Sequence, residues 1–157
     1  MVVINPLTAA LSEKTGLPAV HLDAIFWKEN WVESTHEEFD AAVLAASKED
    51  KWIMDGNYTR TLPMRLRLCD CVIFLDLPRY VCIWRVLKRV FKNYGKCRPD
   101  MGKNCPERLD FSFLRYVWDF RRRQRPKVIK CLESATVPVI TLKSRAEIKA
   151  FLCQFCA

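Results

Sequence analysis

Two apolar runs of strand length, each ending in an aspartate, constrain the fold of this chain more than any other feature. They cover Lys51–Asp55 and Cys71–Asp76, and turn residues follow both, Gly56-Asn57 after the first and Pro78 after the second. Apolar runs of this kind are typical of strands that a parallel sheet buries on both faces. Because the carboxyl ends of parallel strands line one crevice, we expect both aspartates at the same edge of a sheet.

Helical patterns separate these runs, so the chain alternates between strands and helices. Thr35 and Glu38 form a capping box that opens one helix, and Ser144 with Glu147 opens another near the C-terminus. The remaining expected elements are a short helix from Asn5-Pro6 to Gly16, strands at 19–22 and 137–142, helices at 79–93 and 109–123, and a break at Pro126 before a helix at 128–132.

These elements predict an α/β fold with three layers, in which helices flank a parallel sheet. A length of 157 residues suits one domain over 1–157, and 50% hydrophobic residues suffice for a packed core. The stretch at 96–106 carries charge and turn residues without periodicity. We therefore expect a mobile loop there, within a helical lid at about 92–125.

The sequence also predicts a cytoplasmic protein without a membrane partner. No apolar run approaches the roughly 18 residues of a membrane span, and the N-terminus lacks a signal-peptide pattern. The eight cysteines are then expected to be reduced, buried thiols. Cys97 and Cys105 lie in the expected lid without a second pair, which argues against a zinc site with four ligands. We expect no metal except magnesium carried by a nucleotide.

Positive charge is concentrated in one part of the chain. Between Arg85 and Lys130 there are 15 Lys and Arg residues against 4 Asp and Glu, whereas the rest of the chain is slightly acidic. Such segregation attracts polyanions, either nucleotide phosphates or nucleic acid. A solvated helical face is the ordinary alternative, and the density of charge disfavours it.

Five groups of residues occur in the order and at the spacing of one known family. They are His21-Leu22-Asp23 with Phe26-Trp27, Trp52 to Tyr58, Val72 to Asp76, Trp84 to Arg89, and Arg98-Pro99-Asp100. Through them the chain resembles, from Leu11 onward, the DNA-topology-modulation proteins of the FlaR type, which are P-loop proteins related to adenylate kinase. The resemblance implies a nucleotide-kinase-like fold and ATP-dependent phosphoryl transfer to a nucleotide or another small molecule.

The resemblance also implies roles for individual residues. Asp23, Asp55, Arg85 and Arg89 match catalytic positions, since phosphoryl transfer depends on positioning and on neutralising charge. The implied substrate-binding residues are Asn57, Tyr58, Arg60, Arg122, Arg125 and Trp27. Structural roles are the alternative, because Asp-Gly-Asn is also an ordinary turn and tryptophans also pack under helices. His21 is expected to be structural.

The family's phosphate-binding loop is absent from this sequence. Met1-Val2-Val3-Ile4 is followed at once by Asn5-Pro6-Leu7, and no glycine precedes Gly16. A Gly-x-x-x-x-Gly-Lys-Ser/Thr loop would supply backbone N–H groups, a lysine and the hydroxyl that holds Mg²⁺. ATP and Mg²⁺ are therefore cofactors that the resemblance implies, whereas the residues present predict a poor ATPase. A truncated product and a member that has lost catalysis both fit.

Two functions of different classes remain open at this point. The first is an adenylate-kinase-like enzyme whose phosphoryl transfer is impaired. The second is a non-catalytic protein that binds nucleic acid through the basic segment 85–130. Salt separates them, because binding to nucleic acid falls steeply with ionic strength.

Overall fold

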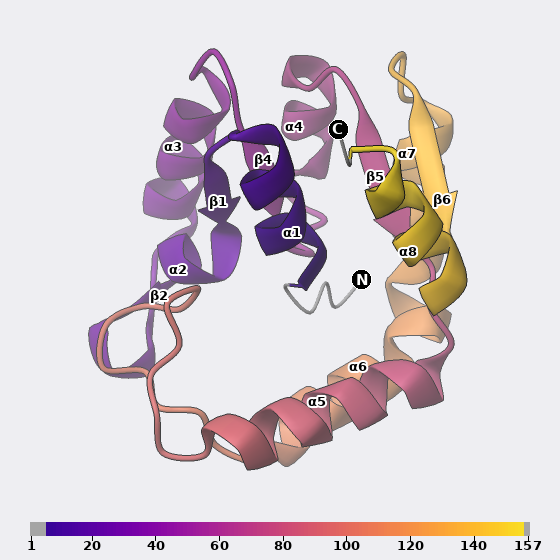
Figure 1. Cartoon of the computed structure of the whole chain (residues 1–157). Helices are drawn as coiled ribbons and strands as arrows, with labels where there is room; N and C mark the ends of the chain where they lie inside the picture. The colour runs from indigo at the N-terminus through magenta and orange to yellow at the C-terminus, as the bar shows by residue number, and fades with distance from the viewer. Residues whose placement is uncertain (1–5, 156–157) are drawn as a thin grey trace.

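The computed structural model describes residues 6–155 and shows a mixed α/β fold with small sheets (Figure 1). Four strands form two parallel pairs, and a short antiparallel pair lies apart from them. The parallel pairs are β1 (Ala19–His21) with β4 (Ile53–Asp55), and β5 (Val72–Leu75) with β6 (Val139–Leu142). The antiparallel pair is β2 (Trp27–Lys28) with β3 (Val32–Glu33).

Helices surround these strands within the described part of the chain. They are α1 (Pro6–Thr15), α2 (Leu22–Phe26), the 3-10 helix η1 (Glu29–Trp31), α3 (His36–Ser47), α4 (Leu62–Leu68), α5 (Arg79–Asn93), α6 (Phe111–Arg123), α7 (Arg125–Glu133) and α8 (Arg145–Cys153).

The two parallel pairs do not join into one sheet. Among residues 6–155, β4 is paired only with β1, and β5 only with β6. The sequence predicts one parallel sheet between helices, and the structure divides this middle layer in two. Asn5, where the first helix was expected to begin, lies outside the described residues.

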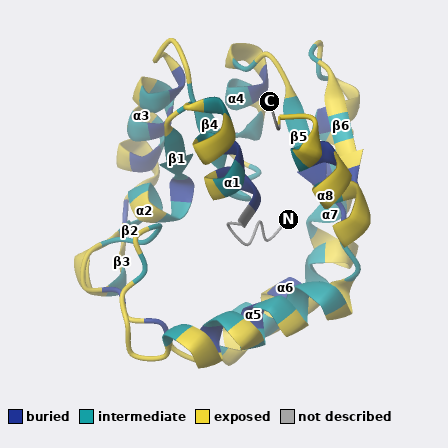
Figure 2. Ribbon diagram, in the orientation of Figure 1, coloured by how far each residue is buried: buried dark blue, intermediate teal, exposed yellow. Residues whose placement is uncertain are grey.

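Buried side chains nevertheless pack on both faces of β5 and β6. Leu75 points to one face, where it packs against Leu7 and Leu11 of α1 and Phe151 of α8. Phe74 points to the other face, where α4 and α7 supply Leu66, Val128 and Leu132. Figure 2 colours these buried residues dark blue. Alternation of side chains along a strand therefore explains why helices cover both faces.

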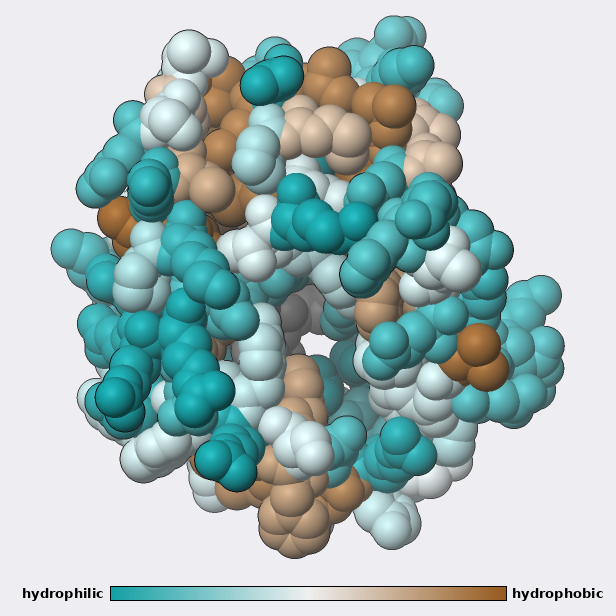
Figure 3. All heavy atoms as spheres, turned by 180° about the vertical axis from the view of Figure 1, so that it is seen from behind, coloured by the Kyte–Doolittle hydropathy of each residue, from teal (hydrophilic) through white to brown (hydrophobic). Residues whose placement is uncertain are grey.

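A helical hairpin of α5 and α6 lies beyond the carboxyl ends of the strands. Val86 and Val90 on α5 are buried against Val117 on α6. In Figure 1 this hairpin runs below the sheets, joined to them by the segment 94–110 on one side and by α7 on the other. Figure 3 shows, from behind, an opening through the molecule above the hairpin.

Local sequence signals predict several helix ends correctly. The Thr35 hydroxyl accepts from the Glu38 backbone N–H, and the Glu38 carboxylate accepts from the Thr35 N–H, so the predicted capping box is confirmed. Gly16 follows α1 with a φ of 70°, as its predicted place after the helix requires. Pro126 stands in the first turn of α7, where its missing N–H costs no helical hydrogen bond.

The segment expected to be a mobile loop carries a buried ion network. Glu107 is 5% exposed and lies 2.9 Å from Arg89 and 2.7 Å from Arg98, and Arg98 also contacts Asp100 at 2.6 Å. The Arg89 guanidinium lies over the ring of Phe113 as well. These contacts fasten the loop to α5 and α6.

The cysteines are less buried than the sequence predicts. All seven that the structure describes are free thiols. Cys105 is buried and contacts the backbone of Trp31 and Lys28, whereas Cys71, Cys97 and Cys153 are exposed. The prediction of buried thiols is therefore wrong for these three, which lie directly before β5, in an isolated bridge to Pro106 and at the end of α8.

Candidate functional site

The carboxyl ends of β1 and β4 bring four polar side chains together. His21 Nδ1 lies 3.0 Å from Asp55 Oδ1, and the Tyr58 hydroxyl donates to Asp23 Oδ1 over 2.8 Å. Parallel pairing places His21 opposite Asp55 in register, so the fold itself puts both pairs at one edge. Asp23, Asp55 and Tyr58, which the resemblance assigns to the site, are thus close in space. His21, expected to be structural, contacts a predicted catalytic carboxylate.

Burial dominates the electrostatics of Asp55. Desolvation raises the pKa of its carboxyl above the usual range, and His21 opposes this shift. Its Oδ2 is buried and has no hydrogen bond among the described residues. A buried carboxylate oxygen without a donor is costly unless a ligand or water supplies one.

Tyr58 connects this edge to the aromatic core. Its ring packs against Phe26 and Phe39 at centroid distances of 5.2 and 4.6 Å. Burial, followed by the charge of Asp23, raises the pKa of the Tyr58 hydroxyl far above the usual range. Tyr58 therefore stays protonated and holds the Asp23 carboxylate as a hydrogen-bond donor.

Gly56 lets the backbone pass close to α2 directly after β4. Its φ is 134°, and a Cβ at this position would lie 2.6 Å from the Cβ of Leu22, which is fully buried. Only glycine combines this conformation with so close an approach. The Gly in the Asp-Gly-Asn run is thus required by the fold.

We predict that Gly56→Ala lowers the free energy of unfolding by about 2 kcal/mol, because the methyl group overlaps Leu22 and the backbone is strained. Urea denaturation would measure the change. Gly16→Ala is the control, since Gly16 has a φ of 70° and open space around it, and only strain of about 1 kcal/mol is expected. Equal losses in both variants would contradict the proposed overlap with Leu22.

Two side chains near this edge were not predicted from the sequence. Arg65 on α4 donates to the backbone oxygens of Gly56 and Tyr58 at 3.4 and 2.9 Å, and burial lowers its pKa to about 10. Tyr116 on α6 accepts a hydrogen bond from Asn57 over 3.1 Å, which joins the hairpin to the strand ends. No local signal marks either residue, because the contacts depend on elements distant in sequence.

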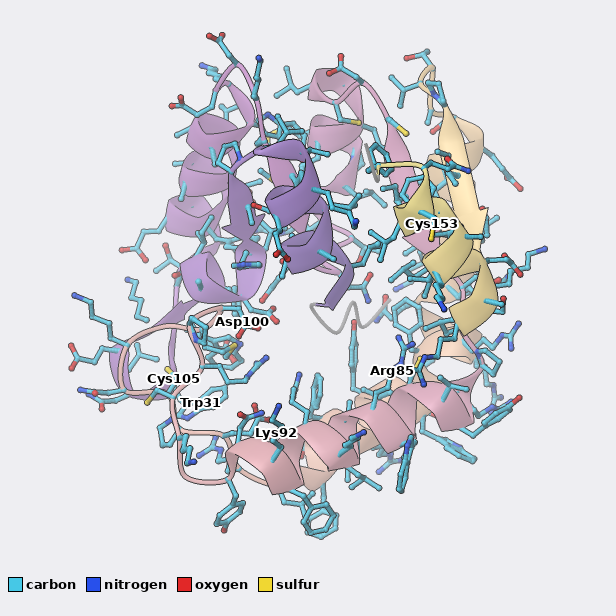
Figure 4. All side chains as sticks on the ribbon, viewed as in Figure 1. Trp31, Arg85, Lys92, Asp100, Cys105 and Cys153 are labelled. Carbon is cyan, nitrogen blue, oxygen red and sulfur yellow. The ribbon has the colours of Figure 1, made fainter. Side chains whose placement is uncertain are left out.

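The predicted arginines divide into two groups. Three of them are engaged in structural contacts: Arg89 with Glu107, Arg125 with Asp76, and Arg60 with Asp40 and the His36 carbonyl. Arg85 lies on the side of α5 that faces the opening, as does Lys92 (Figure 4). Arg122 is exposed on α6. Among the described residues, Arg85, which is half-buried, and Arg122, which is exposed, form no such ion pair.

Trp27 lies in β2, next to Phe26, whose ring packs against Tyr58 of the strand-end cluster. Its ring meets Phe26 and Trp31 edge to face, at 5.0 and 5.3 Å. A Cβ on Gly102 would lie 1.9 Å from the Trp27 carbonyl oxygen, so the loop packs directly on this strand. Packing under the loop accounts for these contacts.

The described residues do not fit Mg-ATP. Asp55 is paired with His21, Asp76 with Arg125, and residues 6–155 contain no group of three His, Cys, Asp or Glu side chains that could hold a metal ion. The start of α1, Pro6-Leu7-Thr8, has neither glycine nor lysine to surround phosphates. We therefore assign no step to ATP or Mg²⁺.

None of the helices described between residues 6 and 155 is long and apolar enough to cross a membrane. Comparisons with protein-family models, with curated proteins and with solved structures gave no match to this chain.

Proposed function

We propose that this chain binds a nucleotide or another small phosphorylated molecule, as an adenylate-kinase-like protein whose phosphoryl transfer is impaired. The observation that supports this best is the buried Asp55 Oδ2 at the strand ends, which has no hydrogen bond among the described residues and lies beside the Asp23–Tyr58 pair. Open α/β sheets bind ligands in the crevice at the carboxyl ends of their strands. Arg85 faces the same opening from α5 (Figure 4).

Each group in the proposed site has a distinct chemical role. Asp55 Oδ2 and the second oxygen of Asp23 accept hydrogen bonds from ligand hydroxyls, as in a ribose. Asn57 is kept in position by Tyr116 and contributes an amide. Arg85 and Arg122 supply positive charge for phosphate, and a guanidinium binds phosphate through paired N–H groups. We expect weak phosphoryl transfer, because residues 6–155 include no Gly-x-x-x-x-Gly-Lys-Ser/Thr loop to surround a donor's phosphates.

Calorimetric titration with adenosine monophosphate, with adenosine as a reference, tests the proposal. Arg85→Met should weaken binding of the monophosphate at least tenfold, since a charged hydrogen bond contributes about 1.5 to 3 kcal/mol, and should leave adenosine binding unchanged. Lys88→Met is the matched control, because Lys88 is exposed on the same helix. Equal losses in both variants, or no binding to the original chain, would reject the site.

A second titration with Mg-ATP addresses the missing loop. A variant carrying an added strand and a Gly-x-x-x-x-Gly-Lys-Ser loop before α1 should bind Mg-ATP, whereas the original chain should bind it weakly. Equal binding by both proteins would show that the loop is not the deciding difference.

Exposed aromatic side chains on the basic hairpin favour nucleic acid as a second candidate. Tyr80, Trp84 and Phe91 are 69%, 67% and 82% exposed and lie four and seven residues apart on α5, so they form one stripe. On α6, Trp118 is 51% exposed and the Arg79 guanidinium lies 5.0 Å from its ring centroid. Stacking aromatic rings beside basic residues are typical of surfaces that bind single strands.

Fluorescence anisotropy with a labelled oligothymidine separates the two candidates. If the hairpin binds single strands, Trp84→Ala should weaken binding about tenfold, because stacking contributes roughly 1 to 3 kcal/mol per base. Affinity should also fall steeply between 50 and 200 mM salt. If neither the Trp84→Ala substitution nor the salt concentration alters the affinity, this surface is excluded as the site that binds single strands.

A further inference from the structure

A large cavity lies between the two parallel pairs, and of its lining residues the proposed function uses Asp55 and Asn57. Its volume is about 840 Å³, and residues of both β4 and β5 line it. The helix α1 closes one side with Leu7 and Leu11, while α4 and α7 supply Leu62, Leu66, Val128 and Leu132. The cavity therefore occupies the middle layer, with helices already in place on both faces.

The strand edges that face this cavity have no partner strand among residues 6–155. Ile53 N–H donates to Pro18 and Val72 N–H donates to Pro138, so these residues face their paired strands, β1 and β6. Successive residues of a strand direct their N–H and C=O groups to alternate edges. The N–H and C=O groups of Met54 on β4 consequently point away from β1. Those of Ile73 and Leu75 on β5 point away from β6. Within the described chain, no strand pairs with either of these edges.

The two edges are also matched in direction. Each pair is parallel, and the arrows of β1 and β6 point the same way in Figure 1. One strand inserted between β4 and β5 would therefore be parallel to both neighbours. It would join the pairs into a single sheet and satisfy both edges at once.

We propose that this cavity binds an extended apolar segment of another polypeptide as a central β-strand. The cavity wall selects apolar side chains on both faces of that strand, because Leu7 and Leu11 lie on one side and Leu66 and Val128 on the other. The two edges select an extended backbone, as in other cases of strand addition. With β5 four residues long, the bound segment spans about four residues, or roughly 13 Å at 3.3 Å per residue.

Hydrogen exchange of the full chain, with and without a synthetic peptide, tests the proposal. The probe is a peptide of alternating valine and isoleucine, blocked at both ends and flanked by lysines. Its binding should slow the exchange of the Met54, Ile73 and Leu75 amides at least tenfold and should raise the Tm. The peptide with a central proline is the control, because proline lacks an N–H and disrupts strand pairing.

Selective N-methylation of the peptide distinguishes a central strand from one added to a single edge. A strand between two edges uses the N–H groups of alternate residues on each side. Methylating either the odd or the even residues should therefore weaken binding at least tenfold. If methylation of only one of the two sets weakens binding, the peptide binds a single edge and the proposal is wrong.

Size-exclusion chromatography of the chain, with and without the peptide, tests whether a second copy of the chain fills the cavity instead. The proposal predicts that the peptide binds without changing the oligomeric state. A dimer that the peptide dissociates would mean that a second copy of the chain fills the cavity, and this would overturn the proposal. Unchanged exchange at Met54, Ile73 and Leu75 would overturn it as well.

Discussion

Replacing Glu107 with alanine is expected to lower the free energy of unfolding by about 4 kcal/mol, because it leaves two buried guanidinium groups without their shared carboxylate. Glu107 is 5% exposed and lies within 3 Å of both Arg89 and Arg98. Asp100 still pairs with Arg98, whereas the ion pair of Arg89 is with Glu107. Equilibrium denaturation in urea would measure the loss.

The same variant should affect the loop before it affects the rest of the protein. The Glu107 backbone bonds Gly95 and Lys96, so the loop is anchored on α5 through this residue. Hydrogen exchange at Gly95 and Glu107 should accelerate strongly in the variant. Glu13→Ala is the control, since Glu13 is exposed on α1 and a surface change is worth less than about 0.5 kcal/mol. Similar losses in both variants would rule out a stabilising network.

Replacing Arg125 with methionine should lower the free energy of unfolding at neutral pH by about 3 kcal/mol. The Arg125 guanidinium donates two hydrogen bonds, of 2.8 and 2.7 Å, to the Asp76 carboxylate. Asp76 is 8% exposed, so loss of the guanidinium leaves a nearly buried charge without its partner. Arg122→Met is the matched control, because Arg122 is exposed and lies three residues away.

The effect of this substitution should depend on pH in a defined direction. Arg125 lowers the pKa of Asp76 below its usual range. The resulting stabilisation is complete above the unfolded pKa, about 3.9, and is lost as the pH falls through the lower, folded value. The difference between the original protein and Arg125→Met should therefore be largest near pH 7 and shrink below pH 4. A difference that stays constant from pH 7 to pH 3 would contradict the ion-pair explanation.

Of the fold, the elements with local signals could be predicted from the sequence. The capping box at Thr35, the glycine after α1 and the amphipathic pattern of α5 each act within one or two turns. Several elements, among them α4, β2 and β3, lack such signals and were not predicted. Helix α4 opens without a side-chain cap, and β2 and β3 are two residues long.

Of the candidate site, the sequence predicted which residues follow the strands but not which groups they contact. Asp23, Asp55 and Tyr58 meet at one edge, as strand ends in a parallel sheet should. The contacts of the arginines could not be predicted in this way, because a helix turns about 100° per residue and a guanidinium reaches over several ångströms. Whether the Arg89 guanidinium contacts a ligand or Glu107 depends on where the segment 94–110 packs against α5.

The sequence by itself determined the alternation of strands and helices, the ends of most helices and the aspartates at the strand ends, because short-range sterics and hydrogen bonds set these features. Only the tertiary structure decided that Glu107 and Asp76 engage Arg89 and Arg125, and that the parallel strands form two pairs around a cavity. Strand pairing and ion pairing join residues distant in the chain, so they depend on how all the elements pack together.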